Sequence, residues 1–385
     1  MNFVYLSPHF PPNYYHFCIH LRNFGANVLG LAEEPFEALR PELKNCLNEY
    51  YRANDMHNYD EMQRALGYLT HRHGKLGGID SHNEYWLETE ARLRTDFNIP
   101  GLNNESIAKI KNKSEMKKQF VKVGVRVARG KVIRTPAQAN EFIDAVGYPL
   151  VAKPDVGVGA TKTYKLTNPE DLAFFWQDKL PVPYIFEEFI QGQIFSFDGL
   201  VNQDGDLVFY TAHRFSTGIM ETVNDDIDLN YISLRKIPAD MEAAGRAVLK
   251  IYALKARFFH FEFFRTSKGE LVALEVNMRP PGGLTTDMFN YANETDVYRE
   301  WANIIVNNQF DGRNERPYHC AYAGRKHNNI YKYSHDQILA ELGSNIVLHQ
   351  EISGVFSAAL GNYGYLILSP DLSDIEHMAA FIQEK

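Results

Sequence analysis

Two carboxylates and an amide oxygen lie close together in a stretch that predicts a β-hairpin. Glu262 lies in the first of two runs in which apolar and polar side chains alternate, and Glu275 and Asn277 lie in the second. A period of two predicts two strands, over residues 258–264 and 270–277, joined by a short loop. Converging carboxylates repel one another unless a hard cation such as Mg²⁺, which prefers oxygen ligands, lies between them. The hairpin alone is equally compatible with an ordinary solvated sheet face.

The register of the hairpin determines how close the carboxylates come. If Arg265 pairs with Glu270, Glu262 lies opposite Ala273 and diagonal to Glu275, with a backbone separation of about 7 to 8 Å. One cation can bridge two carboxylates at that separation. The polar face is predicted to carry His260, Glu262, Glu275 and Asn277, and the apolar face is predicted to carry Phe259, Phe261, Phe263, Val272, Leu274 and Val276.

A positive charge and a bend in the chain follow the second strand. Arg279 precedes the segment Pro280–Gly283, in which two prolines stiffen the chain and two glycines permit close approach of the main chain to a ligand. Thr285, Thr286 and Asp287 then supply N-cap chemistry for another helix. This bend favours a ligand site over a solvated face.

Two lysines occupy positions where an anion would stabilise them. Lys113 precedes Ser114, the predicted N-cap of a helix, so its charge lies at the unfavourable end of the helix dipole. A bound phosphate would remove that conflict, although position alone favours an ordinary surface lysine. Lys153 ends the apolar strand 148–154, where a lysine must reach solvent or meet an anion. The glycine-rich segment 157–163 can fold over a triphosphate, although it also suits an ordinary hairpin.

In this order the motifs resemble the ATP-grasp superfamily. The hallmark of that family is a glutamate on one strand and Glu-x-Asn-x-Arg on the next, here Glu262 and Glu275–Arg279. The resemblance implies that Glu262, Glu275 and Asn277 hold two Mg²⁺ ions, with Mn²⁺ as an alternative, against the phosphates of ATP. It also implies that Arg279 is a catalytic residue that contacts phosphate or the reacting acyl group.

The resemblance extends to the nucleotide contacts. It implies that Lys113 and Lys153 bind ATP, with Lys153 also catalytic, and that the side chain of Glu187 receives the adenine amino group. The further contacts that it implies come from Gly157, Gly159, Ala160, Thr161, Glu188, Phe189 and Ile190. The sequence departs from the family at the ribose, because Ile194 stands where an acid is usual. Whether Gln193 or another group takes its place is left open.

Composition limits the class of protein. The chain has 385 residues and is 45% apolar, enough for more than one packed core. A net charge of -8, from 40 basic and 48 acidic residues, gives no support to nucleic-acid binding. Three isolated cysteines favour a reducing compartment, and the sequence shows neither a signal-peptide pattern nor a long apolar run. We expect a cytoplasmic protein with no membrane or nucleic-acid partner.

The order of predicted elements indicates an α/β (α+β) fold of several domains. A strand, a helix and a strand near the N-terminus predict a Rossmann-like parallel-sheet domain, yet the first turn lacks GxGxxG, which disfavours a dinucleotide-binding dehydrogenase. We expect this domain over 1–100, and the resemblance implies a two-lobed ATP-grasp module with antiparallel sheets after it. Its small lobe with the glycine-loop lid is expected over 101–190 and its large lobe with the metal site over 191–310. A small appended β-rich lobe is expected over 311–385.

Several other polar residues are less decisive. Glu84, Glu88 and Glu90, on a predicted helix, are expected to form a solvated face, although the resemblance places such a helix beside the substrate site. His213 and Arg214 follow a predicted strand. They are equally compatible with a substrate contact and with a solvated position.

The resemblance implies an ATP-dependent carboxylate–amine ligase. Such an enzyme forms an acyl phosphate from ATP and a small acid, an amino acid among the candidates, and passes the acyl group to an amine with release of ADP and phosphate. A phosphotransferase on the same scaffold and a non-catalytic nucleotide sensor are the alternatives. The expected partners are the small-molecule acid and amine and, because the family often dimerises, a second copy of the chain. The sequence identifies neither the acid nor the amine.

Overall fold

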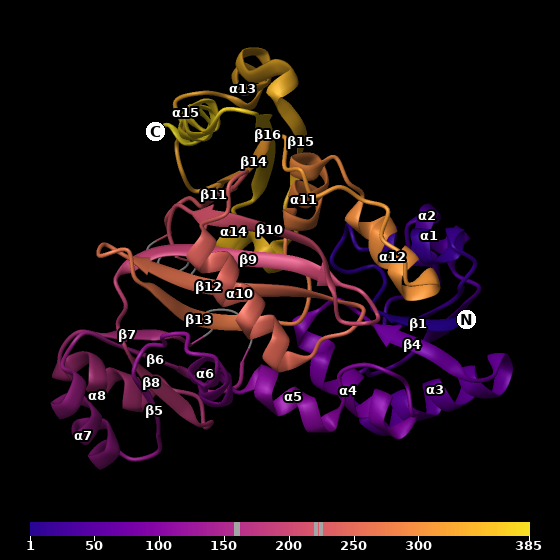
Figure 1. Cartoon of the computed structure of the whole chain (residues 1–385), viewed down its shortest axis with the longest axis horizontal. Coiled ribbons are helices and arrows are strands. Elements are labelled where there is room, and N and C mark those ends of the chain that lie inside the picture. Colours follow the sequence, from indigo (N-terminus) through magenta and orange to yellow (C-terminus); the bar gives the residue numbers. More distant parts are fainter. Residues whose placement is uncertain (158–161, 219–221, 223–225) are drawn as a thin grey trace.

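Three β-sheets organise the described part of the chain (Figure 1). They are seen in a computed structural model that describes residues 1–157, 162–218, 222 and 226–385. The N-terminal sheet is parallel and the other two are antiparallel, which confirms the predicted α/β (α+β) fold class. Within these ranges, no helix is both long enough and apolar enough to cross a membrane.

The N-terminal sheet has the strand order β3-β2-β1-β4. Strands β1 and β2 are nearly continuous buried apolar runs, as expected for parallel strands that are covered on both faces. Strand β4 ends at Asp80, and the residues after it leave the carboxyl edge of the sheet, where such sheets bind ligands. The elements of this part are β1 (Asn2–Leu6), α1 (Tyr15–Asn23), β2 (Asn27–Ala32), α2 (Pro41–Cys46), β3 (Glu49–Arg52), α3 (Tyr59–His73), β4 (Leu76–Asp80) and α4 (Leu87–Asp96).

An antiparallel sheet of four strands follows, with the strand order β5-β8-β6-β7. Its apolar core includes Phe142 and Phe175, which come from two helices that pack on the sheet. We call this sheet and the helices before and around it the small lobe. Its elements are α5 (Asn104–Lys111), α6 (Lys113–Lys122), β5 (Gly130–Ile133), α7 (Pro136–Val146), β6 (Leu150–Pro154), β7 (Tyr164–Leu166), α8 (Pro169–Asp178) and β8 (Tyr184–Glu188).

The largest sheet has eight strands in the order β13-β12-β9-β10-β11-β14-β16-β15. The three C-terminal strands continue this sheet and form no sheet of their own, because β14 pairs with the short strand β11. The predicted boundary of a separate lobe over 311–385 therefore does not coincide with a boundary between sheets, and the lobe stays a prediction. The elements are β9 (Gly192–Val201), β10 (Leu207–Phe215), β11 (Asn230–Ser233), α10 (Ala239–Tyr252), β12 (Arg257–Thr266), β13 (Leu271–Asn277), α11 (Thr285–Asn293), α12 (Val297–Asn307), β14 (His319–Arg325), α13 (His335–Leu342), β15 (Ile346–Glu351), α14 (Gly354–Leu360), β16 (Tyr363–Ser369) and α15 (Leu372–Gln383).

A bulge in the hairpin of β12 and β13 changes the predicted register. Glu262 lies directly opposite Glu275, whereas the neighbouring pair is Phe263 and Ala273, so one residue of β13 is extra. The predicted diagonal arrangement of the two glutamates is therefore wrong. The main-chain N–H of Ala273 donates outward to the carbonyl of Arg126, at 2.8 Å. This bond accompanies the bulge and ties β13 to the chain that leads into β5.

Close packing of helix α10 on the large sheet buries the apolar face of the hairpin (Figure 1). Phe197, Phe259 and Phe261 are fully buried in this core. Leu274, predicted to share it, lines a cavity on the other side because of the bulge. Gly245 of α10 permits the close approach, since a Cβ atom there would lie 2.2 Å from Cδ1 of Phe197.

We expect Gly245→Ala to lower the free energy of unfolding by about 1–3 kcal/mol, because the added methyl group would overlap the Phe197 ring. Gly67→Ala is the matched control. Gly67 is exposed on α3 with no atom within 4 Å of an added Cβ, so alanine should stabilise the helix by about 0.5–1 kcal/mol. Urea denaturation measures both changes. Equal effects of the two substitutions would contradict the packing described here.

Candidate active site

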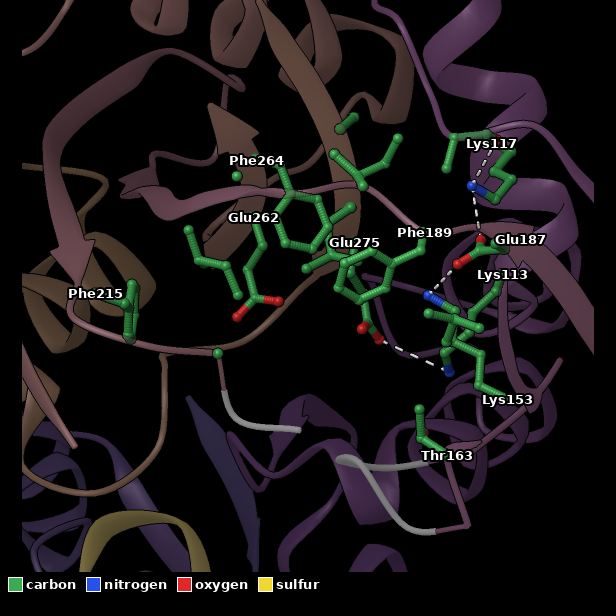
Figure 2. A pocket seen from close by; sticks show the side chains of 18 of the residues that line it. Lys113, Lys117, Lys153, Thr163, Glu187, Phe189, Phe215, Glu262, Phe264 and Glu275 are labelled. Atoms are coloured by element: carbon green, nitrogen blue, oxygen red, sulfur yellow. Dashed lines mark hydrogen bonds and ion pairs between the residues drawn. The ribbon is translucent and has the colours of Figure 1, made fainter. Parts of the chain in front are cut away.

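A cavity of about 520 Å³ opens between the small lobe and the hairpin of β12 and β13 (Figure 2). The carboxylates of Glu262 and Glu275 reach into it from one side, and the side chains of Lys113 and Lys153 lie on the other. Its charged and amide lining comes from Glu84, Lys113, Lys117, Lys153, Lys165, Glu187, Glu188, Gln191, His260, Glu262, Glu275, Asn277 and Arg279. Both signs of charge therefore meet in one cavity.

The cavity brings together three oxygen-bearing side chains of the hairpin. Glu262 and Glu275 are directly opposed on β12 and β13, and Asn277 lies opposite His260 on the same strands. The glutamate side chains are 20% and 21% exposed, so a ligand can reach both. Two carboxylates and an amide form an all-oxygen donor set, which could hold a hard divalent cation such as Mg²⁺. Within the described ranges, no group of three or more His, Cys, Asp and Glu side chains is suited to hold a metal, so this set depends on its amide.

The charges around Glu275 indicate that a cation suits the site. Burial raises the pKa of Glu275, and the like charges of Glu84 and Glu262 raise it further. Lys113, 3.9 Å away, lowers this pKa without restoring it to its ordinary value. A carboxylate in this position is stabilised by an additional cation. The donor set and its uncompensated negative charge both fit Mg²⁺.

Lys113 is the first residue of α6. The predicted N-cap is wrong by two residues: Asn112 is the N-cap, whereas Ser114 donates its hydroxyl and its main-chain N–H to Asp155, each at 2.8 Å. The buried Nζ of Lys113 donates to the carbonyl of Gly157 at 3.4 Å. The predicted nucleotide contacts at Gly159, Ala160 and Thr161 lie outside the described residues.

A carboxylate between two lysines lies on the small-lobe side of the cavity (Figure 2). Glu187 on β8 pairs with Lys153 on β6 and with Lys117 on α6, each at 2.7 Å. Burial raises the pKa of Glu187, but the two ammonium groups outweigh burial and lower it to about 2. The carboxylate expected to receive the adenine amino group is thus already paired with two cations. The residues after it, Glu188, Phe189 and Ile190, also line the cavity.

Lys117 is a cavity residue that the motifs do not assign to the site. It lies four residues after Lys113 on α6, and side chains at that spacing share one face of a helix. Besides pairing with Glu187, it donates to the carbonyl of Ala128 at 3.0 Å. Helical spacing from Lys113 is the signal that could have found it.

Glu84 is a second such residue, and the prediction of a solvated face is wrong for Glu84 and Glu90. Glu84 is 7% exposed, and its carboxylate pairs with Arg279 at 2.9 Å and with Lys111 at 3.2 Å. Burial lowers the pKa of the Arg279 guanidinium, but the adjacent Glu84 raises it above its ordinary value. Glu90 is fully buried and pairs with Arg94 at 3.0 Å. The position of Glu84 just beyond the carboxyl edge of the parallel sheet is the signal that could have identified it.

Apolar side chains form another part of the cavity wall (Figure 2). Ile194 lies there with Phe215 and Phe264, so the position that carries a ribose-binding acid in the resembled family is apolar here. Gln193 is not one of the lining residues, and its side-chain amide donates to the carbonyl of Phe215 at 3.4 Å. The side chain of Gln193 is thus held by the main chain of β10.

A buried hydrogen-bonded chain leads away from Glu262. His260 Nε2 lies 3.0 Å from the Glu262 carboxylate, and its Nδ1 contacts Asp198. Burial lowers the pKa of His260, but the charges of Asp198 and Glu262 raise it to about 10. His213 lies behind Asp198 at 2.7 Å, and Arg214 pairs with a glutamate of α15. Neither of these two residues lines the cavity.

One segment of the chain, which includes the hairpin of β12 and β13, matches a known protein family. Residues 146–287 match a family model described as an ATP-grasp domain. The chain carries an ATP-grasp domain. Among the curated relatives of this chain is the L-arginine-specific L-amino acid ligase of Bacillus subtilis, 25% identical over 243 residues. The match covers 60% of this chain and 58% of the relative, which is less than two thirds of the relative's length.

Solved structures share the ATP-grasp fold at low sequence identity. An L-amino acid ligase from Bacillus licheniformis has a TM-score of 0.77 and 14% identity, over 98% of this chain and 95% of its own. The biotin carboxylase domain of the 2-oxoglutarate carboxylase of Hydrogenobacter thermophilus, solved with MgADP, has a TM-score of 0.73 and 15% identity, over 96% of this chain and 86% of its own. These likenesses extend the shared fold beyond the matched domain to nearly the whole chain.

We expect Glu187→Gln to lower the free energy of unfolding by about 3–5 kcal/mol at neutral pH, because it removes the carboxylate that pairs with both Lys117 and the buried Lys153. The stability that ionised Glu187 contributes is present above its ordinary pKa of 4.5 and is lost as the pH falls toward about 2. The substitution should therefore remove this part of the acid dependence. Urea denaturation at a series of pH values measures both effects.

The control for this experiment is Glu115→Gln, which breaks the exposed pair with Lys118 on the same helix as Lys117. It should change the free energy of unfolding by less than about 0.5 kcal/mol. If the wild type and Glu187→Gln lose stability equally between pH 4.5 and 2, the ion pairs of Glu187 do not stabilise the fold in the way described.

Proposed function

We propose that this protein is an ATP-dependent ligase that joins a carboxylic acid to an amine and releases ADP and phosphate. The observation that carries the proposal is one cavity in which three cationic side chains meet two carboxylates and an amide, from Lys113, Lys153, Arg279, Glu262, Glu275 and Asn277. A triphosphate would balance the cationic groups and a divalent cation would balance the acids. The names of the Bacillus subtilis relative and the Bacillus licheniformis structure support an amino acid as the acid substrate.

Glu262, Glu275 and Asn277 are the residues that we propose to hold two Mg²⁺ ions, with Mn²⁺ as an alternative. When bound, the ions would offset the negative charge of the β- and γ-phosphates during transfer. The contribution of the chain is to present three ligand oxygens on two paired strands before the nucleotide binds. The MgADP bound to a protein of the same fold supports this assignment.

For the nucleotide, we propose that the phosphates lie against Lys113 and Lys153 and the base against the end of β8. The carboxylate of Glu187 can receive the adenine amino group only by giving up an ion pair. Main-chain groups of Glu188, Phe189 and Ile190 are therefore the simpler adenine contacts, with Glu187 holding the lysines. The loop that carries Gly157, Gly159, Ala160 and Thr161 is proposed to cover the phosphates.

In the proposed reaction a carboxylate oxygen of the acid attacks the γ-phosphorus, which forms an acyl phosphate and releases ADP. The amine then attacks the acyl carbon, loses a proton and expels phosphate. Lys153 and Arg279 are the proposed catalytic residues, because their charges stabilise the transferring phosphoryl group. A closed cavity would protect the acyl phosphate from hydrolysis.

The proposed partners are the small-molecule acid and amine and a second copy of the chain as a homodimer. We also propose the division into domains at residues 100, 190 and 310. Cys18, Cys46 and Cys320 are buried free thiols, which supports a reducing compartment, proposed to be the cytoplasm.

Substitution of the metal ligands tests the site. Glu275→Gln and Asn277→Ala are each expected to lower kcat by at least about 10²-fold, because each removes charge stabilisation at the phosphates. Both should bind a non-hydrolysable ATP analogue in the absence of metal as the wild type does. Glu270→Gln, at the exposed end of the same hairpin, is the matched control and should retain activity. Full activity in Glu275→Gln and Asn277→Ala would contradict the metal site.

The reaction class is tested by measuring ADP release across a panel of acids, amino acids included, with and without amines. We expect rapid release only when an acid and an amine are both present, because the acyl phosphate is passed on inside the closed cavity. A lasting phosphorylated product without an amine would identify a phosphotransferase instead. ATP binding without turnover over the whole panel would identify a nucleotide sensor.

A further inference from the structure

His260 links the candidate metal ligand Glu262 to the interior of the large sheet. The two residues lie two positions apart on β12, so their side chains share one face. His260 Nε2 is 3.0 Å from Oε1 of Glu262. On its other side, Nδ1 contacts Oδ1 of Asp198, which is the register partner of His260 on β9.

Asp198 is itself held by the neighbouring strands. Its second carboxylate oxygen accepts hydrogen bonds from the hydroxyl of Ser196, at 2.6 Å, and from the ring of His213 on β10, at 2.7 Å. Ser196, Asp198 and His213 are completely buried. Three adjacent strands, β12, β9 and β10, therefore supply one buried chain of polar groups that ends at the cavity.

Both ring nitrogens of His260 face carboxylate oxygens. Nε2 lies against Oε1 of Glu262 and Nδ1 lies against Oδ1 of Asp198, so the ring is held from both ends. The ring cannot turn away without leaving Asp198 short of a partner in the core, which is costly. One oxygen of Glu262 is thus held by His260, and the other remains available to the cavity.

We propose that His260, held by Asp198, is a positioning residue that orients the Glu262 carboxylate toward the divalent cation shared with Glu275 and Asn277. The inference rests on the metal site of the proposed function. His260 acts through Glu262. Its contacts with Glu262 and Asp198 hold in place a carboxylate whose side chain is 20% exposed and would otherwise be free to turn. Removal of such a partner typically weakens metal binding by about 10- to 100-fold.

Two substitutions of His260 separate its two hydrogen bonds. In His260→Asn, the short amide can still donate to Asp198 but does not reach Glu262. In His260→Gln, the longer amide can donate to Glu262 in place of Nε2. Both variants replace the imidazole ring by a neutral amide, so loss of the ring alone does not distinguish them.

The measurement is the affinity of the full chain for Mn²⁺ in the presence of a non-hydrolysable ATP analogue, detected by electron paramagnetic resonance. This measurement needs neither the acid nor the amine. We expect His260→Asn to bind Mn²⁺ at least about 10-fold more weakly than the wild type. We expect His260→Gln to stay within about threefold of the wild type, because it keeps the donor to Glu262. Thermal unfolding and metal-free binding of the analogue confirm that both variants are folded.

Glu262→Gln distinguishes failure of this inference from failure of the metal site. If Glu262→Gln binds Mn²⁺ as the wild type does, the metal site is wrong and the role of His260 falls with it. If Glu262→Gln loses the ion while His260→Asn keeps it, the metal site stands and the positioning role is overturned. Equal losses in His260→Asn and His260→Gln would also overturn it, since the donor to Glu262 would then not be the cause.

Discussion

Separation of charge across one cavity is the constraint on which the rest of the structure depends. One wall carries the opposed carboxylates of Glu262 and Glu275, and the other carries the ammonium groups of Lys113 and Lys153. Like charges gathered in a poorly solvated site are unfavourable, and removal of one partner leaves the others uncompensated. The fold meets this constraint by giving most of these groups a partner of opposite charge, as Glu187 does for Lys153. The charge that remains uncompensated is the negative charge of Glu262 and Glu275 on the hairpin, and a cation fits there.

A second buried network connects this cavity to the N-terminal sheet. Arg257, at the start of β12, pairs with Asp80 at the end of β4 at 2.8 Å and donates to the carbonyl of Met278 at 2.6 Å. One side chain therefore joins the carboxyl edge of the parallel sheet to the segment that carries Arg279. This connection explains why Glu84, far away in the sequence, lies beside Arg279. The carboxylates of the cavity therefore come from two sheets: Glu84 follows a strand of the N-terminal sheet, and Glu262 and Glu275 lie on the large sheet.

Features that depend on local pattern could be predicted from the sequence, and features that depend on distant partners could not. The hairpin, its polar face and the parallel sheet follow from alternation and from the order of elements. The bulge could not be predicted, because the outward partner of Ala273 is Arg126, in a different part of the chain. The cavity positions of Glu84 and Lys117 could not be predicted for the same reason, since their charges are balanced by Arg279 and Glu187.

Continuation of the large sheet into the C-terminal strands is another feature that depends on a distant partner. Strand β11 is only Asn230–Ser233, too short for alternation to show, yet it is the strand on which β14 pairs. Three predicted C-terminal strands therefore looked like a unit of their own. Their hydrogen-bonding partner was present in the chain, but the sequence pattern was too brief to reveal it.

The main-chain bond between Arg126 and Ala273 has a mechanical consequence. It attaches the segment of the small lobe between α6 and β5 to the edge of the large sheet, two residues from Glu275. Helix α6, which carries Lys113, packs on the same strand. A rotation of the small lobe about this pivot would carry nearby groups through a short arc and remote ones, such as Thr163 and Lys165, through a longer arc. The outer rim of the cavity could then open for a nucleotide while the spacing of Lys113 and Glu275 changes least.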